Sequence, residues 1–176
     1  NAKRGIPYFS FSLAVAAGGT MADVELAYVY DFGSGEEWTA ERGSGARLDG
    51  EPLRTPPPKD TLEILSFEGT TTEAIAEHLP GLIGVAGRIR VMGSLALSLC
   101  HLAAGRVDGV CSLKPARSVD IAAAQLLVNE QGLAIELVTP TQAGITDLIV
   151  EESGETFEAN AVLKARAYAA RANMLT

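Results

Sequence analysis

The sequence predicts an α/β protein that begins with an antiparallel strand meander and continues as a smaller layered α/β unit. In the first third, apolar side chains alternate with polar or small ones, which is the period of a strand with one buried face. Three consecutive prolines at 56–58 then interrupt the pattern, because proline cannot donate a ladder hydrogen bond. Beyond them, strand patterns alternate with helical ones. We therefore expect a strand meander over residues 1–58 and an α/β domain over residues 59–176.

The elements of the meander follow from alternation and turn residues. Two glycines, Gly18 and Gly19, separate the first two expected strands, and Asp49-Gly50 is a hairpin turn signal because both residues tolerate positive φ. The expected strands span 8–15, 23–30, 36–40 and 46–48.

After the prolines, helix boundaries are predicted from capping residues and from glycines that end helical patterns. We expect strands at 62–67, 88–92, 107–111, 133–138 and 148–150, and helices at 70–79, 93–104, 120–131 and 158–173.

Composition restricts the class of protein. The chain has 176 residues, of which 47% are hydrophobic and 20% charged, which is typical of a folded domain with a sizeable core. Its net charge of −8 argues against general binding to nucleic acid or to anionic membranes. No apolar run approaches the roughly 18 residues that a membrane span needs.

The cysteines and histidines predict no zinc site. Cys100 and Cys111 lack a metal-ligand spacing and indicate free thiols in a reducing cytoplasm. His78 and His101 have no partner at ligand spacing, so packing or surface roles are expected.

Two predicted helix starts carry the chemical interest. At Gly93-Ser94, a glycine lets backbone amides approach a ligand, and the same residues could simply cap the helix. Asp120 opens an alanine-rich helix, where it could cap the helix or hold a metal ion against a phosphate. The residues alone leave both alternatives open.

The order of several short motifs resembles that of the inositol monophosphatase family of metal-dependent sugar phosphatases. No single motif is specific, but together they run through nearly the whole chain. They are Asn1, Gly5-Ile6-Pro7, Gly43-Ser44-Gly45-Ala46 with Asp49-Gly50, Arg90-Val91-Met92-Gly93-Ser94, Ala103-Ala104-Gly105-Arg106-Val107-Asp108-Gly109, Val119-Asp120-Ile121-Ala122-Ala123-Ala124 and Glu130-Gln131-Gly132.

The resemblance implies a Mg²⁺-dependent phosphomonoesterase that acts on inositol phosphate or fructose 1,6-bisphosphate, usually as a homodimer in the cytoplasm. It implies that Asp120 is a metal ligand and that the substrate, a small phosphorylated polyol or sugar, contacts Gly93 and Ser94. Lys114 and Arg117, in the loop before Asp120, are candidates for a second substrate phosphate or for sugar hydroxyls. A nucleotide bisphosphate phosphatase of the same superfamily differs only in its leaving group.

Departures from the family pattern lead to a further expectation. Val119 replaces the usual Trp, Ala124 replaces a Gly, and the family's other metal-binding carboxylates lie upstream of the position that Asn1 matches. Glu36-Glu37 and Glu151-Glu152 are interpreted as solvated turns that do not replace them. We therefore expect a C-terminal portion of the enzyme, inactive alone. The alternative is a diverged, non-catalytic interaction or regulatory module.

Overall fold

A computed structural model describes residues 1–57, 59, 61–68, 71–112 and 116–133. Its first sheet is an antiparallel meander in which each strand pairs with the next along the chain. The strands are β1 (Ser10–Ala16), β2 (Val24–Asp31), β3 (Glu37–Glu41), β4 (Gly45–Leu48) and β5 (Glu51–Pro52).

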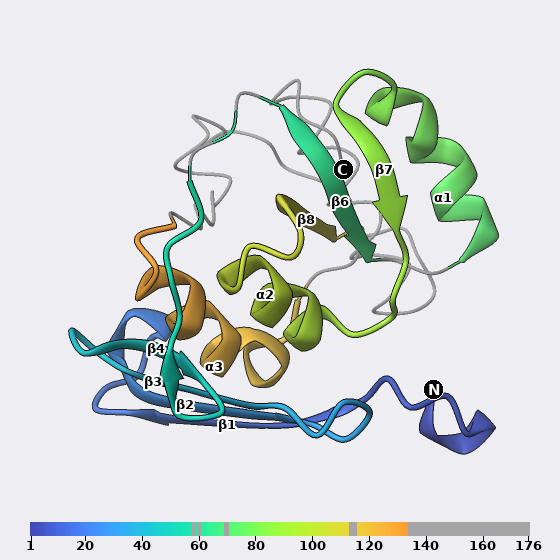
Figure 1. Cartoon of the computed structure of the whole chain (residues 1–176). Helices are drawn as coiled ribbons and strands as arrows, with labels where there is room; N and C mark the ends of the chain where they lie inside the picture. The colour runs from blue at the N-terminus through green and yellow to red at the C-terminus, as the bar shows by residue number, and fades with distance from the viewer. Residues whose placement is uncertain (58, 60, 69–70, 113–115, 134–176) are drawn as a thin grey trace, which may run out of the picture.

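The second sheet is parallel, with the order β7-β6-β8. Its strands are β6 (Leu62–Glu68), β7 (Ala86–Arg90) and β8 (Gly109–Ser112). The helices are α1 (Thr72–His78), α2 (Leu95–Ala103) and α3 (Ser118–Asn129). Figure 1 shows α2 and α3 between the two sheets and α1 beside β7. The predicted α/β class is thus confirmed.

The main core lies between the meander and the two central helices. Along β2 the inward positions alternate with exposed ones, so that Val29 is fully buried while its neighbours are not. Trp38 of β3 is also fully buried, in the same cluster as Leu97 of α2 and Leu127 of α3. Burial of each large apolar side chain stabilises the folded state by about 1.5–3 kcal/mol. The core fixes how α2 and α3 begin relative to β1.

The outer face of β1 and β2 is apolar and exposed. Its cross-strand pairs are Phe11 with Tyr30, Leu13 with Tyr28 and Val15 with Leu26. Leu13, Val15 and Leu26 are each about half exposed. One face of the meander is therefore covered by helices, while the described residues leave the apolar part of the other face open.

Most sequence predictions of elements within the described residues are confirmed to within a few residues. The short strand β5 was not predicted, and α3 begins at Ser118 with Arg117 as the N-cap residue, rather than at Asp120. Expected elements from 134 onward lie outside the described residues, and the division at Pro58 stays a prediction. Among the described residues, no helix is long and apolar enough to cross a membrane.

Candidate active site

The two helix starts singled out in the sequence meet at one open cavity of about 820 Å³. Gly93 and Ser94, which precede α2, lie on its wall together with Asp120 in the first turn of α3. Asn1 and Tyr8 also line this cavity. The fold thus brings together three of the site residues predicted from the sequence, Gly93, Ser94 and Asp120, although the two helix starts are far apart along the chain.

The turn before α2 is held from two sides. Gly93 has φ +86°, a conformation that side chains other than glycine rarely adopt, and a Cβ atom there would lie 3.3 Å from the Asn1 side-chain nitrogen. The Gly93 N–H donates to Glu68 Oε2 at 3.1 Å. On the other side, Asn1 Nδ2 donates to the Tyr8 carbonyl at 2.8 Å and to the Gly93 carbonyl at 3.5 Å. These contacts orient the peptide that leads into α2.

Ser94 is the N-cap residue of α2, but its side chain makes no capping hydrogen bond. The first backbone N–H groups of a helix have no intrahelical acceptor. Leu95 and Ala96 of this first turn line the cavity. The Ser94 hydroxyl and these backbone donors therefore form one polar edge that suits an anionic oxygen.

Asp120 is not the helix cap that the sequence suggested. It is the third residue of α3, and both its carboxylate oxygens accept hydrogen bonds from the Arg117 guanidinium, at 2.8 and 2.9 Å. The pair is solvent-accessible, and the carboxylate raises the pKa of Arg117 above its ordinary value.

The described residues do not complete a magnesium site. Mg²⁺ prefers octahedral coordination by oxygen, usually from carboxylates, water and substrate phosphate. Within the described part of the chain, no group of three or more His, Cys, Asp or Glu side chains could hold a metal ion. Asp120 offers one carboxylate. The Arg117 guanidinium occupies both oxygens of that carboxylate and must move before both can bind a cation.

Arg117, a further predicted substrate contact, is not on the cavity wall. It is paired with Asp120. Lys114 lies outside the described residues. Their predicted contacts with substrate stay predictions.

Sequence reasoning missed Glu68, a buried carboxylate behind the cavity wall. It is 5% exposed and ends β6, where Ser98 Oγ donates to its Oε1 at 2.6 Å. The available signal was a glutamate directly after Phe67 at the end of the strand. The neighbouring Tyr8 hydroxyl donates to Met92 Sδ at 3.3 Å, and burial raises the pKa of Tyr8.

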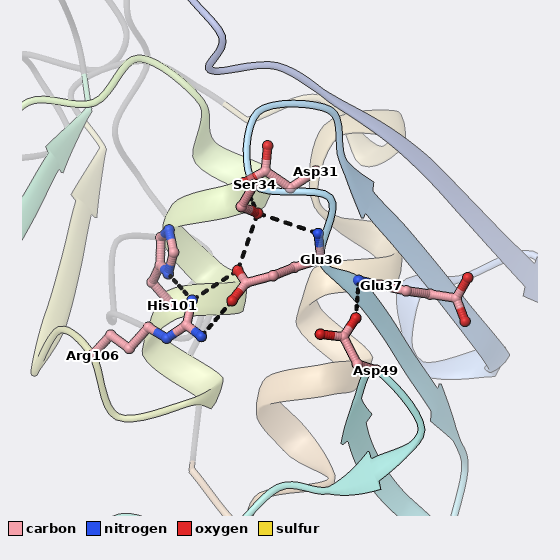
Figure 2. A network of polar contacts seen from close by, with 7 residues as sticks. All are labelled: Asp31, Ser34, Glu36, Glu37, Asp49, His101 and Arg106. Carbon is pink, nitrogen blue, oxygen red and sulfur yellow. Dashed lines mark hydrogen bonds and ion pairs between the residues drawn. The ribbon is translucent and has the colours of Figure 1, made fainter.

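Glu36 is likewise different from the expected solvated turn. Arg106 donates to both Glu36 oxygens, at 2.8 and 2.6 Å, and lies 3.4 Å from His101 Nδ1 (Figure 2). Burial, followed by the charge of Arg106, lowers the pKa of His101. The expected packing role of His101 is confirmed, since its ring also stacks on Tyr8.

Two other acidic motif residues hold the backbone. Asp108 accepts hydrogen bonds from the Glu63 and Ile64 N–H groups and from Lys59. Glu130, just after α3, accepts from the N–H groups of Gly43 and Gly45.

Comparison with known proteins identifies the family. A profile of the Inositol monophosphatase family matches residues 3–175. The fructose-1,6-bisphosphatase/inositol-1-monophosphatase of Thermococcus kodakarensis is 32% identical over 159 residues, which are 90% of this chain and 53% of that protein. The Nus factor SuhB of Escherichia coli K12 is 37% identical over 134 residues, 72% of this chain and 48% of that protein.

Comparison with solved structures gives the same family. An IMPase from Thermotoga maritima superposes with a TM-score of 0.63 at 33% identity, over 73% of this chain and 49% of that one. The fold and the matches define the class of this protein as that of the inositol monophosphatase fold. The chain belongs to the inositol monophosphatase family. It spans about half the length of the curated relatives it matches.

Proposed function

We propose that this chain forms part of a Mg²⁺-dependent phosphomonoesterase that hydrolyses inositol phosphate or fructose 1,6-bisphosphate. The observation that carries the proposal is that the Gly93-Ser94 turn and Asp120 line the same cavity. Backbone donors at a helix start suit a phosphate, and a carboxylate beside them suits the cation that would neutralise it. The names of the archaeal relatives support both substrates.

In this proposal, Gly93 and Ser94 form the turn that receives the substrate phosphate, with the Ser94 hydroxyl and the amides that follow it as donors, and Asp120 is one metal ligand. Lys114 and Arg117 remain candidates for a second phosphate or for sugar hydroxyls. Two-metal phosphate hydrolysis needs more carboxylates than Asp120 alone supplies. We therefore expect the 176-residue chain by itself to lack turnover.

Phosphate release in the presence of Mg²⁺ tests the proposal. The assay uses the protein produced from the whole gene, including any sequence that flanks this chain. This protein should release phosphate from inositol 1-phosphate or fructose 1,6-bisphosphate. Asp120→Asn should remove nearly all of this activity, while Asp49→Asn, in the hairpin turn after β4, is the matched control. Unchanged turnover in the Asp120 variant would contradict its role as a ligand.

A second candidate is a non-catalytic regulatory or interaction module. It is favoured by the relatives named Nus factor SuhB and by the engagement of both Asp120 oxygens with Arg117. Calorimetry with Mg²⁺ separates the two candidates, since stoichiometric binding that Asp120→Asn removes would argue against a purely structural role. A nucleotide bisphosphate phosphatase would be recognised by assaying such a bisphosphate in parallel.

We also propose a homodimer in the cytoplasm. The exposed apolar pairs of β1 and β2 support self-association, because contiguous apolar surface favours contact with another protein. The free thiols of Cys100 and Cys111 are compatible with a reducing compartment. Sedimentation at several concentrations would measure the oligomeric state.

A further inference from the structure

We infer that Glu68 is a positioning residue for the proposed substrate site: it fixes the Gly93 turn so that the first turn of α2 presents its free donors to the cavity. The inference rests on the proposed function, since it concerns the same phosphate-binding turn. Glu68 touches no reacting group. It acts through Gly93 and Ser98, which donate hydrogen bonds to its two carboxylate oxygens and are held in place by them.

The carboxylate is buried without a cationic partner among the described residues. Glu68 is 5% exposed, and none of the ion pairs found in the described ranges includes it. A buried carboxylate is costly unless hydrogen bonds satisfy it. Here a backbone N–H and a hydroxyl O–H do so, one on each oxygen. Hydrogen bonds to a charged acceptor are roughly twice as strong as neutral ones, so the turn is held firmly.

The bond to Glu68 also decides which donors face the substrate. The Gly93 N–H points inward to Glu68 Oε2 and is therefore unavailable to a phosphate. The donors that remain include the Ser94 hydroxyl and the first N–H groups of α2, and Ser94, Leu95 and Ala96 are residues of the cavity wall. A phosphate oxygen bound there needs the turn to hold its direction, because misplacement by about 1 Å can cost 100-fold in rate.

A chain of buried hydroxyls ties this arrangement to the parallel sheet. Ser66 Oγ donates to Ser98 Oγ at 2.9 Å, and Ser98 Oγ donates to Glu68 Oε1. Ser66 and Ser98 are both fully buried, in β6 and in the middle of α2. Strand β6, helix α2 and the Gly93 turn are thus joined by one hydrogen-bonded path that ends at the cavity.

The carboxylate can be replaced in a way that separates geometry from charge. Glutamine at position 68 can still accept from the Gly93 N–H through its oxygen, while its amide donates to Ser98 Oγ and the hydroxyl chain reverses direction. Alanine removes both contacts. The nearby Glu63 lies on the same strand, has a side chain that is 67% exposed and makes no contact with the turn, so Glu63→Ala is the matched control.

The test is a titration of the 176-residue chain with inorganic phosphate, followed by the NMR signals of the Leu95 and Ala96 amides, together with hydrogen exchange of the Gly93 amide. We expect Glu68→Ala to weaken phosphate binding at least tenfold and to speed exchange at Gly93. Glu68→Gln and Glu63→Ala should stay within about threefold of the unsubstituted chain. This rescue by glutamine would not be seen if the site needed only the charge of Glu68.

Each outcome bears on a stated claim. Phosphate binding that is intact in the unsubstituted chain and unchanged in Glu68→Ala overturns the role of Glu68 alone. Absence of binding in the unsubstituted chain contradicts the proposed phosphate site, and the role of Glu68 falls with it. If Glu68→Ala does not fold, Ser98→Ala takes its place: it frees Glu68 Oε1, and unchanged phosphate affinity with unchanged exchange at Gly93 overturns the inference.

Discussion

Arg106 and Glu36, seventy positions apart, form a two-pronged ion pair with N–O distances of 2.8 and 2.6 Å. The Arg106 guanidinium carbon also lies 5.2 Å from the centre of the Trp38 ring. One side chain thus joins the loop after α2 to the start of β3 and covers the main core. A planar guanidinium suits this double role, since it can bond a carboxylate through two N–H groups and stack on an aromatic face.

The first prediction concerns that double contact. Arg106→Lys keeps the charge but loses the second hydrogen bond and the planar stacking, so we expect the free energy of unfolding to fall by about 1–2 kcal/mol. Urea denaturation measures the change. Arg47→Lys, whose guanidinium donates to the Gly50 carbonyl at 3.2 Å, is the control and should change stability by less than about 0.5 kcal/mol. Equal effects in the two variants would contradict the prediction.

The second prediction concerns the carboxylate that follows α3. Glu130 accepts from the Gly43 and Gly45 N–H groups, both at 2.9 Å, and so binds the β3–β4 hairpin to the end of the helix. Glu130→Ala should lower the free energy of unfolding by about 1–3 kcal/mol, because it leaves two donors without their acceptor.

Hydrogen exchange provides the specific readout for Glu130. Exchange at the Gly43 and Gly45 amides should become faster in Glu130→Ala and stay unchanged in Glu41→Ala, an exposed carboxylate of β3. If the two glycine amides exchange at the same rate in all three proteins, the hydrogen bonds do not hold the hairpin.

These contacts show which features a sequence can predict here. The alternation in β1 and β2 is local, because side chains two apart share a face, and it correctly predicted both strands. The partners of Glu36, Glu68 and Glu130 lie 25 to 87 positions away, so no spacing rule could find them. Motif resemblance located Gly93, Ser94 and Asp120, whereas the pairing of Asp120 with Arg117 depends on side-chain conformation near the start of α3.

The third prediction concerns acid stability. The hydrogen bond from Lys59, with those from the Ile64 and Glu63 N–H groups, holds the pKa of Asp108 below its ordinary value. The carboxyl is therefore more acidic in the folded than in the unfolded chain. Its contribution to stability is present above the unfolded pKa of about 4 and is lost as the pH falls through the folded pKa.

Asp108→Asn should accordingly be less stable than the unsubstituted chain at pH 7, by about 1–2 kcal/mol. The difference should narrow as the pH falls below about 4, because the unfolded form of the unsubstituted chain then takes up a proton at Asp108 before the folded form does. Urea denaturation at pH 7, 5 and 3 measures it, with Glu41→Gln as the exposed control. A difference that stays constant over this range would mean that the charge of Asp108 does not contribute.

The fourth prediction concerns competition at Asp120. If Asp120 is a metal ligand, Arg117→Ala frees both of its oxygens and should strengthen Mn²⁺ binding at least threefold. Paramagnetic broadening of the amide signals near residue 120 measures this binding. Asp120→Asn should abolish the broadening, and Arg4→Ala, an exposed arginine outside the cavity lining, should leave it unchanged. Identical titrations for Arg117→Ala and the unsubstituted chain would show that the guanidinium does not compete.

The fifth prediction compares the two faces of the meander through one matched pair of valines. Val29 of β2 is fully buried against the helices, whereas Val15 of β1 is 48% exposed on the outer face. Val29→Ala removes two buried methyl groups and leaves a cavity, so we expect it to lower the free energy of unfolding by about 2–3 kcal/mol. Val15→Ala should lower the free energy of unfolding by less than about 0.5 kcal/mol in the monomeric chain, because the Val15 side chain buries little apolar surface there. A cost at Val15 that matches Val29, or that grows with protein concentration, would show that another surface covers this face, since binding to the folded state alone adds to stability.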